Sequence, residues 1–246
     1  MLARISLALL AVCWSSLAIA WDDFGHRMVV KLTYLKLDPD VRTKVDDLLG
    51  GGFKALVEAS RSADGNKAGR PDTRPWHYVT IPLGAQGYDR ERDCPASDCI
   101  VEKLQQFVEL LKSDTATKPE KQEALRFVLR LVADIHQPLH CADNKDRGGS
   151  DVALVWGKRK TNLYEVWDHY VFTNTLTQVS ESNSNGNVVD WCNESHEISR
   201  QVVYEGLPLN RGTVSQAYIE RARSVASDQL SKAAARLAMI LNDALR

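Results

Sequence analysis

The chain has 246 residues, which suits one medium domain or one large helical domain, and its 44% hydrophobic and 26% charged residues are ordinary for a globular protein. With 31 basic and 32 acidic residues the formal net charge is −1, so the composition excludes a strongly basic surface over the whole molecule. If the ligand is a nucleic acid, metal ions rather than a broad basic patch must supply much of the positive charge.

The first residues have the pattern of a secretory signal peptide. Arg4 precedes an apolar run over 5–13 that is too short to span a bilayer, and the Ala-Ile-Ala sequence that ends at Ala20 is a small-residue cleavage site. An uncleaved anchor is the alternative, which the short run disfavours. We therefore expect a signal peptide over 1–20 and a single domain over 21–246. The mature chain is predicted to be periplasmic or secreted, monomeric and without membrane insertion.

Four cysteines remain after removal of the signal peptide, an even number that suits an oxidising compartment. Cys94 and Cys99 bracket a short loop and are predicted to form a disulfide. Cys141 and Cys192 are then paired by elimination. A zinc site of four thiolates is the weaker alternative, because the spacings do not suit it.

Apolar residues recur at helical spacing in most of the chain, which predicts an all-α, mainly helical fold with minor β structure. The segment 64–93 is predicted to be irregular because it is rich in proline and glycine, and it includes an extended piece over 76–82. A loop over 142–160 contains a strand-like run, and 180–187 is predicted to be a surface loop. The predicted helices are 21–36, 40–49, 53–63, 99–112, one that begins near 119, 161–173, 194–205 and 213–245.

The helix that begins near 119 contains the stretch RFVLRLVADIHQPLH and ends in side chains that can bind metal, namely Asp134, His136 and His140. Pro138 ends this helix, so His140 can fold back towards Asp134. Taken singly, each of these residues is more often a surface charge or a hydrogen-bonded core group. Together with other aspartates and histidines they form the oxygen and nitrogen donor set that zinc takes: Asp64, His77 and Asp168.

His26 lies five residues after Trp21, the predicted mature N-terminus. In a helix this spacing places the imidazole near the α-amino group. A free amine and its own carbonyl can chelate a metal, so signal cleavage would become a condition for building the site. His26 taken alone is more often an ordinary core or surface histidine.

Seven motifs occur in a fixed order along the mature chain: WDDFGH, SADGNK, RPWHYV, DIHQPLH, DRGGSD, NLYEVWD and WCNESH. They resemble the zinc-dependent single-strand nucleases of the S1/P1 type, which are related to zinc phospholipase C. The resemblance implies a multi-helix fold and a phosphodiesterase that cleaves single-stranded RNA or DNA to 5′-phosphate products, with possible 3′-nucleotidase activity.

The resemblance also implies up to three Zn²⁺ ions in a helical cleft. Trp21 (amine and carbonyl), His26 and Asp134 would hold one; Asp64, His77 and Asp134 a second; His140 and Asp168 a third. The chemistry is metal-assisted attack of water on phosphorus. Lys67 lies where the family has a basic residue, usually arginine, that neutralises charge in the transition state, so Lys67, Asp64 and Asp134 are the expected catalytic residues.

Tyr78 matches an aromatic residue that stacks a base in the family, a contact worth about 1–3 kcal/mol per base. On the sequence alone, a core tyrosine is an equally good interpretation of Tyr78. His136 matches no ligand position and is predicted to be structural.

Two positions depart from the family pattern, because Arg130 and Tyr164 stand where histidine ligands are expected. A guanidinium cannot ligate a metal, and Arg130 would instead pair with the nearby carboxylates. Tyr164 is a poor ligand unless a metal lowers its pKa, and it would otherwise hydrogen-bond Asp168. We expect one intact zinc site and reduced activity.

Two further interpretations remain. A non-catalytic binder could hold nucleotides or nucleic acid through the cleft, Tyr78 and Arg130. A purely structural zinc protein is the third possibility and the weakest, because so many cleft residues are present.

Overall fold

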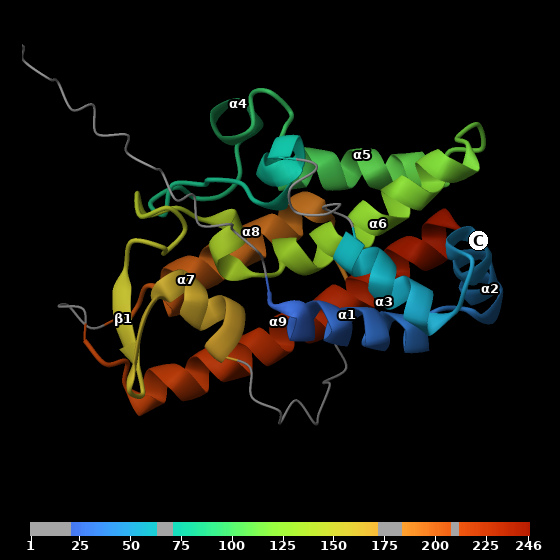
Figure 1. Cartoon of the computed structure of the whole chain (residues 1–246). Coiled ribbons are helices and arrows are strands. Elements are labelled where there is room, and N and C mark those ends of the chain that lie inside the picture. Colours follow the sequence, from blue (N-terminus) through green and yellow to red (C-terminus); the bar gives the residue numbers. More distant parts are fainter. Residues whose placement is uncertain (1–20, 63–70, 172–183, 208–211) are drawn as a thin grey trace, which may run out of the picture.

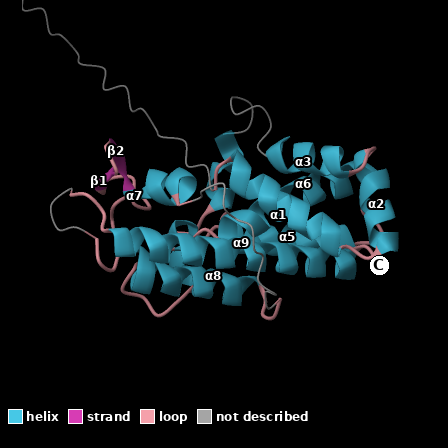
Figure 2. Cartoon of the chain, turned by 90° about the horizontal axis from the view of Figure 1, so that it is seen from below, coloured by secondary structure: helices cyan, strands magenta, loops and turns pink. Residues whose placement is uncertain are grey.

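The computed structural model describes residues 21–62, 71–171, 184–207 and 212–246, and it confirms a mainly helical fold. Helix α6 (Lys118–Ile135) runs through the middle of the molecule and packs against α1 (Asp23–Lys36), α3 (Phe53–Ser62), α5 (Ile100–Lys112) and α9 (Gln216–Ala244) (Figure 1). Figure 2 shows the small β-hairpin at one end of the molecule and α2 with the C-terminus at the other. No helix in the described ranges combines the length and apolar character needed to cross a bilayer.

The remaining elements are shorter and connect the long helices. Helices α2 (Pro39–Leu49), α4 (Arg90–Asp93), α7 (Leu163–Glu165) and α8 (Val188–Ile198) are α-helical; η1 (Pro71–His77) and η2 (Pro138–Cys141) are 3₁₀ turns; η3 (Val166–Tyr170) and η4 (Ser199–Val203) are π-helical turns. Strands β1 (Ala153–Trp156) and β2 (Arg159–Asn162) pair antiparallel, with Ala153 opposite Asn162.

The sequence explains why α6 is central and where it ends. Thr117 and Glu120 form a capping box at its start, in which each side chain binds the other residue's backbone N–H. In its last two thirds every residue from Ala124 to Ile135 except Arg126 is buried, so this part of the helix is surrounded by core on all sides. It stops three residues before Pro138, which lacks the N–H that a further turn requires. Asp134 is thereby fixed in the last turn of a fully packed helix.

Three predicted elements are wrong in position or type. Helix α8 begins at Val188 and not near 194, because Asn187 caps it in a box with Asp190. The helix predicted over 161–173 is replaced, within the described residues, by the end of β2, the single turn α7 and the π turn η3. The piece predicted to be extended over 76–82 begins as the end of η1 and becomes extended after His77, with a bridge from Pro82 to Asp143.

The cysteine predictions have different outcomes. Cys94 and Cys99 form the predicted disulfide, which closes a five-residue separation. The predicted bond between Cys141 and Cys192 is not present: both are buried free thiols that hydrogen-bond each other across η2 and α8. Burial, reinforced by the neighbouring Cys192 sulfur, raises the pKa of the Cys141 thiol well above its usual range, so both sulfurs pack as small apolar groups.

His136 belongs to a buried polar network that joins α6, α8 and α9. Its Nδ1 lies 2.7 Å from the Val132 carbonyl, and its Nε2 accepts from Arg236 at 2.8 Å. Arg236 also pairs with Glu194 at 2.7 Å. Burial, together with the charge of Arg236, lowers the pKa of His136 to about 3, so the ring is neutral and structural.

Candidate metal and nucleotide site

Asp134 is the centre of the site, since its carboxylate is 0% exposed and receives three side chains from three elements. His26 Nε2 on α1 lies 3.3 Å from Oδ1, and His77 Nδ1 at the end of η1 lies 2.7 Å from Oδ2. Arg130 Nε, one turn earlier on α6, lies 3.4 Å from Oδ2. The structure thus brings together residues that are more than a hundred positions apart in the sequence, and it places Arg130 in the ion pair that the sequence predicted.

The charge at this centre is fixed by the chain itself. Burial alone would raise the pKa of Asp134, but the Arg130 guanidinium and the contacts with His26 and His77 outweigh it and hold that pKa well below its usual range. Asp134 is therefore an ionised carboxylate whose counter-ion is a guanidinium that cannot lose its proton. This pairing satisfies a buried charge without any bound ion.

The two oxygens of Asp134 are not equivalent. Oδ2 is occupied by His77 and Arg130, whereas Oδ1 receives no well-formed hydrogen bond within the described residues. The 3.3 Å between Oδ1 and His26 Nε2 is close to the roughly 3.3 Å that separates two ligands of one tetrahedral zinc with bonds of about 2.0–2.1 Å. The two donors on the Oδ1 side have the spacing of zinc ligands, whereas the guanidinium on the Oδ2 side disfavours a cation there.

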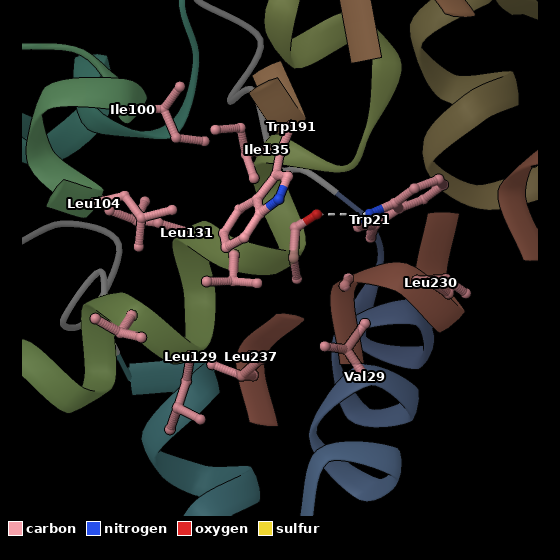
Figure 3. Packing of buried hydrophobic residues seen from close by; sticks show 14 of the residues in the cluster. Trp21, Val29, Ile100, Leu104, Leu129, Leu131, Ile135, Trp191, Leu230 and Leu237 are labelled. Carbon is pink, nitrogen blue, oxygen red and sulfur yellow. Dashed lines mark hydrogen bonds between the residues drawn. The ribbon is translucent and has the colours of Figure 1, made fainter. Parts of the chain in front are cut away.

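Trp21 is packed against the last turn of α6, which carries Asp134. Its indole is fully buried and donates from Nε1 to the Ala133 carbonyl at 2.9 Å (Figure 3). The next backbone N–H, that of Asp22, donates to the Asp168 carbonyl at 3.1 Å, and the Asp22 side chain caps α1. Trp21 and Asp22, which precede α1, are therefore anchored to α6 and to η3 respectively.

A second pair of candidate ligands, His140 and Asp168, lies on η2 and η3. His140 Nδ1 is 2.6 Å from the His77 carbonyl, and its Nε2 has no hydrogen-bond partner among the described residues. Burial lowers the pKa of His140 to about 4, and burial raises the pKa of Asp168 to about 7 although Tyr164 and Gln137 hydrogen-bond its carboxylate. The unused Nε2 of this buried imidazole is an unsatisfied polar atom, which a bound cation would satisfy.

Tyr164 contacts both members of this pair. Its ring stacks near His140, with 6.4 Å between ring centroids, and its hydroxyl hydrogen-bonds Asp168. The sequence analysis left two roles for Tyr164, metal ligation or a hydrogen bond to Asp168, and the structure shows the hydrogen bond. It leaves this pair with one imidazole where the family pattern has two.

Gln137 is a site residue that sequence reasoning missed. Its side-chain amide donates to Asp168 Oδ1 at 2.9 Å, and its carbonyl accepts from the Leu139 N–H at 2.6 Å. The sequence signal that could have identified Gln137 is its position in DIHQPLH, between the candidate ligands Asp134 and His140. Gln137 orients Asp168 and shapes the turn that presents His140.

We expect Gln137→Leu to lower the free energy of unfolding by about 1–3 kcal/mol, because it removes both hydrogen bonds and leaves buried polar groups unsatisfied. The measurement is urea denaturation of the metal-free protein. Gln216→Leu is the control, since the Gln216 amide makes an exposed contact with Glu220, and its effect should stay within about 0.5 kcal/mol. Equal effects of the two changes would refute the orienting role.

A cavity of about 640 Å³ opens beside the second pair and is lined by Tyr78, His140 and Tyr164. Its size suits a ligand as large as a nucleotide. Because Tyr78 lines this cavity and is only half-buried, a ligand-contacting position fits it better than the core position that the sequence left open. Three basic side chains also line the cavity: Arg74, Lys145 and Arg147.

Two predicted site residues, Asp64 and Lys67, lie outside the described residues. In the part of the chain that the structure describes, no group of three or more histidine, cysteine, aspartate or glutamate side chains has the geometry of a complete metal site. What the described residues provide is the contact of His26 and His77 with Asp134 and, apart from it, the candidate ligands His140 and Asp168, both of which Tyr164 contacts.

A mainly helical fold with buried aspartate and histidine pairs beside a nucleotide-sized cavity agrees with the class of nuclease that the motifs resemble. The chain belongs to the S1/P1 nuclease family, whose sequence profile matches residues 21–185 and 173–246. Members of this family are hydrolases of phosphodiester bonds.

Among its relatives, Endonuclease 2 of Arabidopsis thaliana is 31% identical over 159 residues, which cover 60% of this chain and 54% of the relative. Nuclease S1 of Aspergillus oryzae is 29% identical over 171 residues, which cover 67% of this chain and 58% of the relative. Endonuclease 1 of Arabidopsis thaliana is 25% identical over 284 aligned positions, which cover 96% of this chain and 90% of the relative. The chain thus aligns with little more than half the length of the first two.

Proposed function

We propose that the chain is an exported zinc-dependent phosphodiesterase that cleaves single-stranded RNA or DNA to 5′-phosphate products. The observation that carries the proposal is the convergence of His26 and His77 on the buried Asp134, next to the cavity lined by Tyr78 and His140. The printed names of the relatives, which are nucleases and endonucleases, support hydrolysis of nucleic acid.

Zinc, when bound, supplies Lewis-acid polarisation of a phosphate and lowers the pKa of a bound water. Trp21, His26 and Asp134 would hold one ion. Asp64, His77 and Asp134 would offer a second position, which the Arg130 guanidinium beside Oδ2 weakens, and His140, Asp168 and Tyr164 would offer a weak third position.

The remaining roles belong to the chain itself. Tyr78 stacks a base in the cavity, and Arg74 with Lys145 attracts the phosphates. Lys67 neutralises charge on the reacting phosphate, which a lysine does without the two-pronged contact of an arginine.

Arg130 sets the level of activity in this proposal. A fixed positive charge 3.4 Å from Oδ2 repels a divalent ion that would use the same oxygen, at a cost of several kcal/mol even for an effective dielectric of about 20. One tightly held zinc and slow cleavage follow.

The function is tested by incubating a 5′-labelled single-stranded oligonucleotide with the protein in zinc and in EDTA. Slow, zinc-dependent cleavage to products with 5′-phosphate ends is expected. Absence of cleavage together with retained nucleotide binding would favour the second candidate, a non-catalytic binder, for which the ion pair of Arg130 with Asp134 is the supporting observation.

One extra residue before Trp21 is expected to lower zinc retention at least about tenfold, because it removes the free amine from the Trp21 chelate while the indole anchor at Ala133 stays in place. The measurement is zinc content after dialysis, for proteins that start at Trp21 and one residue earlier. Equal zinc content in the two forms would rule out the N-terminal chelate, and an extra residue at the C-terminus is the control.

A further inference from the structure

A second cavity, of about 610 Å³, lies between α1 and α3 and is separate from the cavity that contains Tyr78. Nine side chains line it, four of them cationic and one acidic: Phe24, Arg27, Met28, Lys31, Phe53, Lys54, Val57, Glu58 and Arg61. We call it the α1–α3 groove. A chain whose net charge is −1 thus gathers four cations along a single groove.

The helical repeat explains how these cations come together. Arg27 and Lys31 are one turn apart on α1 and both are exposed, and Lys54 is exposed at the start of α3. None of these three forms an ion pair with a described residue. Arg61 differs because it pairs with Asp23 at 2.8 Å. Three of the four cations are therefore available to an anionic ligand.

The floor and the far end of the α1–α3 groove are apolar. Phe24, Met28 and Val57 are half-buried beneath the cations, and Phe53 is 40% exposed, with its ring 5.7 Å from that of Tyr34. An exposed aromatic ring in the same groove as exposed cations is the arrangement on which unpaired bases stack while phosphates contact lysine or arginine.

The position of the groove relates it to the candidate site. Helix α1 carries His26 on its buried face and Arg27 on its exposed face, near the end where Trp21 is anchored. From there α1 and α3 run side by side away from Asp134 towards α2 (Figure 1). A strand that leaves the site along α1 meets the groove within the first turns of the helix.

We propose that the α1–α3 groove is an exosite for single-stranded nucleic acid, which holds the part of the strand that extends beyond the cleavage site. The inference rests on the proposed nuclease function. The site itself selects the nucleotides next to the scissile bond, whereas the groove gives long strands additional affinity. The nearly equal numbers of acidic and basic residues in the whole chain gave no indication of this local excess of cations.

The test compares Lys31→Gln/Lys54→Gln with the matched control Lys158→Gln/Lys160→Gln, whose exposed lysines lie at the hairpin end of the molecule. Binding of an oligothymidylate of about 20 nucleotides, longer than one site size, is measured by fluorescence anisotropy in EDTA over a range of salt. The groove variant should bind at least about fivefold more weakly, and its salt slope should fall by about 1.4 for two lost phosphate contacts. The control variant should match the parent.

A second measurement separates the exosite from the proposed function. Cleavage of a thymidine dinucleotide, which is too short to reach the groove, should be unchanged in the Lys31/Lys54 variant. An unchanged affinity and salt slope for the long oligonucleotide would overturn the exosite, as would an equal loss of dinucleotide cleavage. Loss of binding to anionic lipid vesicles without loss of oligonucleotide binding would assign the groove to a membrane and also overturn it. If the parent cleaves nothing, the proposed function fails, and the anisotropy result still decides whether the exosite exists.

Discussion

The double variant Arg130→His/Tyr164→His is expected to cleave single-stranded DNA at least about a hundredfold faster than the parent in the presence of zinc, the equivalent of about 2.7 kcal/mol of transition-state stabilisation. Each substitution returns an imidazole one turn before a carboxylate that the structure retains, Asp134 in one case and Asp168 in the other. The change at 130 also removes the guanidinium that lies 3.4 Å from Asp134 Oδ2.

Zinc content and melting temperature test the same prediction independently of activity. The parent should retain one zinc per chain after dialysis and the double variant up to three. Because the variant loses the internal counter-ion of Asp134, its metal-free form should have a lower melting temperature than the metal-free parent. Added zinc should raise the melting temperature of the variant more than that of the parent. Zinc at a hundred times its dissociation constant is worth about 2.7 kcal/mol.

The matched control is Arg126→His/Tyr170→His, which makes the same two chemical changes outside the site; Arg126 lies one turn before Arg130 on α6, and Tyr170 contacts Arg159. Its activity and zinc content should follow the parent. A parent that binds three zinc ions tightly, or that cleaves as fast as the double variant, would show that Arg130 does not disable the site.

The helices could be predicted from the sequence because their apolar spacing is strong, as in α1, α5 and α6. The π turns at 166–170 and 199–203 have no local sequence signal. The start of α8 was predicted six residues too late, although Asn187 and Asp190 at capping-box spacing were visible signals.

For the site, sequence motifs predicted that His26, His77 and Asp134 would act together, and the structure brings them into contact. The role of Gln137 could not be predicted, because its bond to Asp168 joins two elements 31 residues apart and depends on the tertiary fold. The α1–α3 groove was missed for the same reason. Its cations are spread over two helices, and whole-chain composition averages them against acidic residues elsewhere.

Asp134→Asn is expected to lower the free energy of unfolding of the metal-free protein by about 3–5 kcal/mol, because it removes a fully buried carboxylate and leaves the Arg130 charge buried without its partner. The size of this effect measures how strongly Arg130 substitutes for a metal. Urea denaturation in EDTA gives the value directly.

The loss in free energy of unfolding of the double variant Asp134→Asn/Arg130→Met should be about 1–3 kcal/mol smaller than the sum of the losses of the two single variants. The reason is that the second change removes the charge that the first leaves unpaired. The control cycle uses Asp151→Asn and Arg147→Met, an ion pair with the same four-residue spacing whose side chains are 51% and 66% exposed. Its coupling should stay within about 0.5 kcal/mol.

Additive effects at Asp134 and Arg130 would mean that the guanidinium is not the counter-ion of the carboxylate, and the account of weakened zinc binding on the Oδ2 side would lose its basis. A strong coupling has a consequence for the whole molecule. A chain that neutralises its central carboxylate internally can fold without zinc, so EDTA should lower the melting temperature of the parent only by the contribution of its one bound zinc ion. The Arg130→His variant, which lacks that internal charge, should then depend on zinc for its stability.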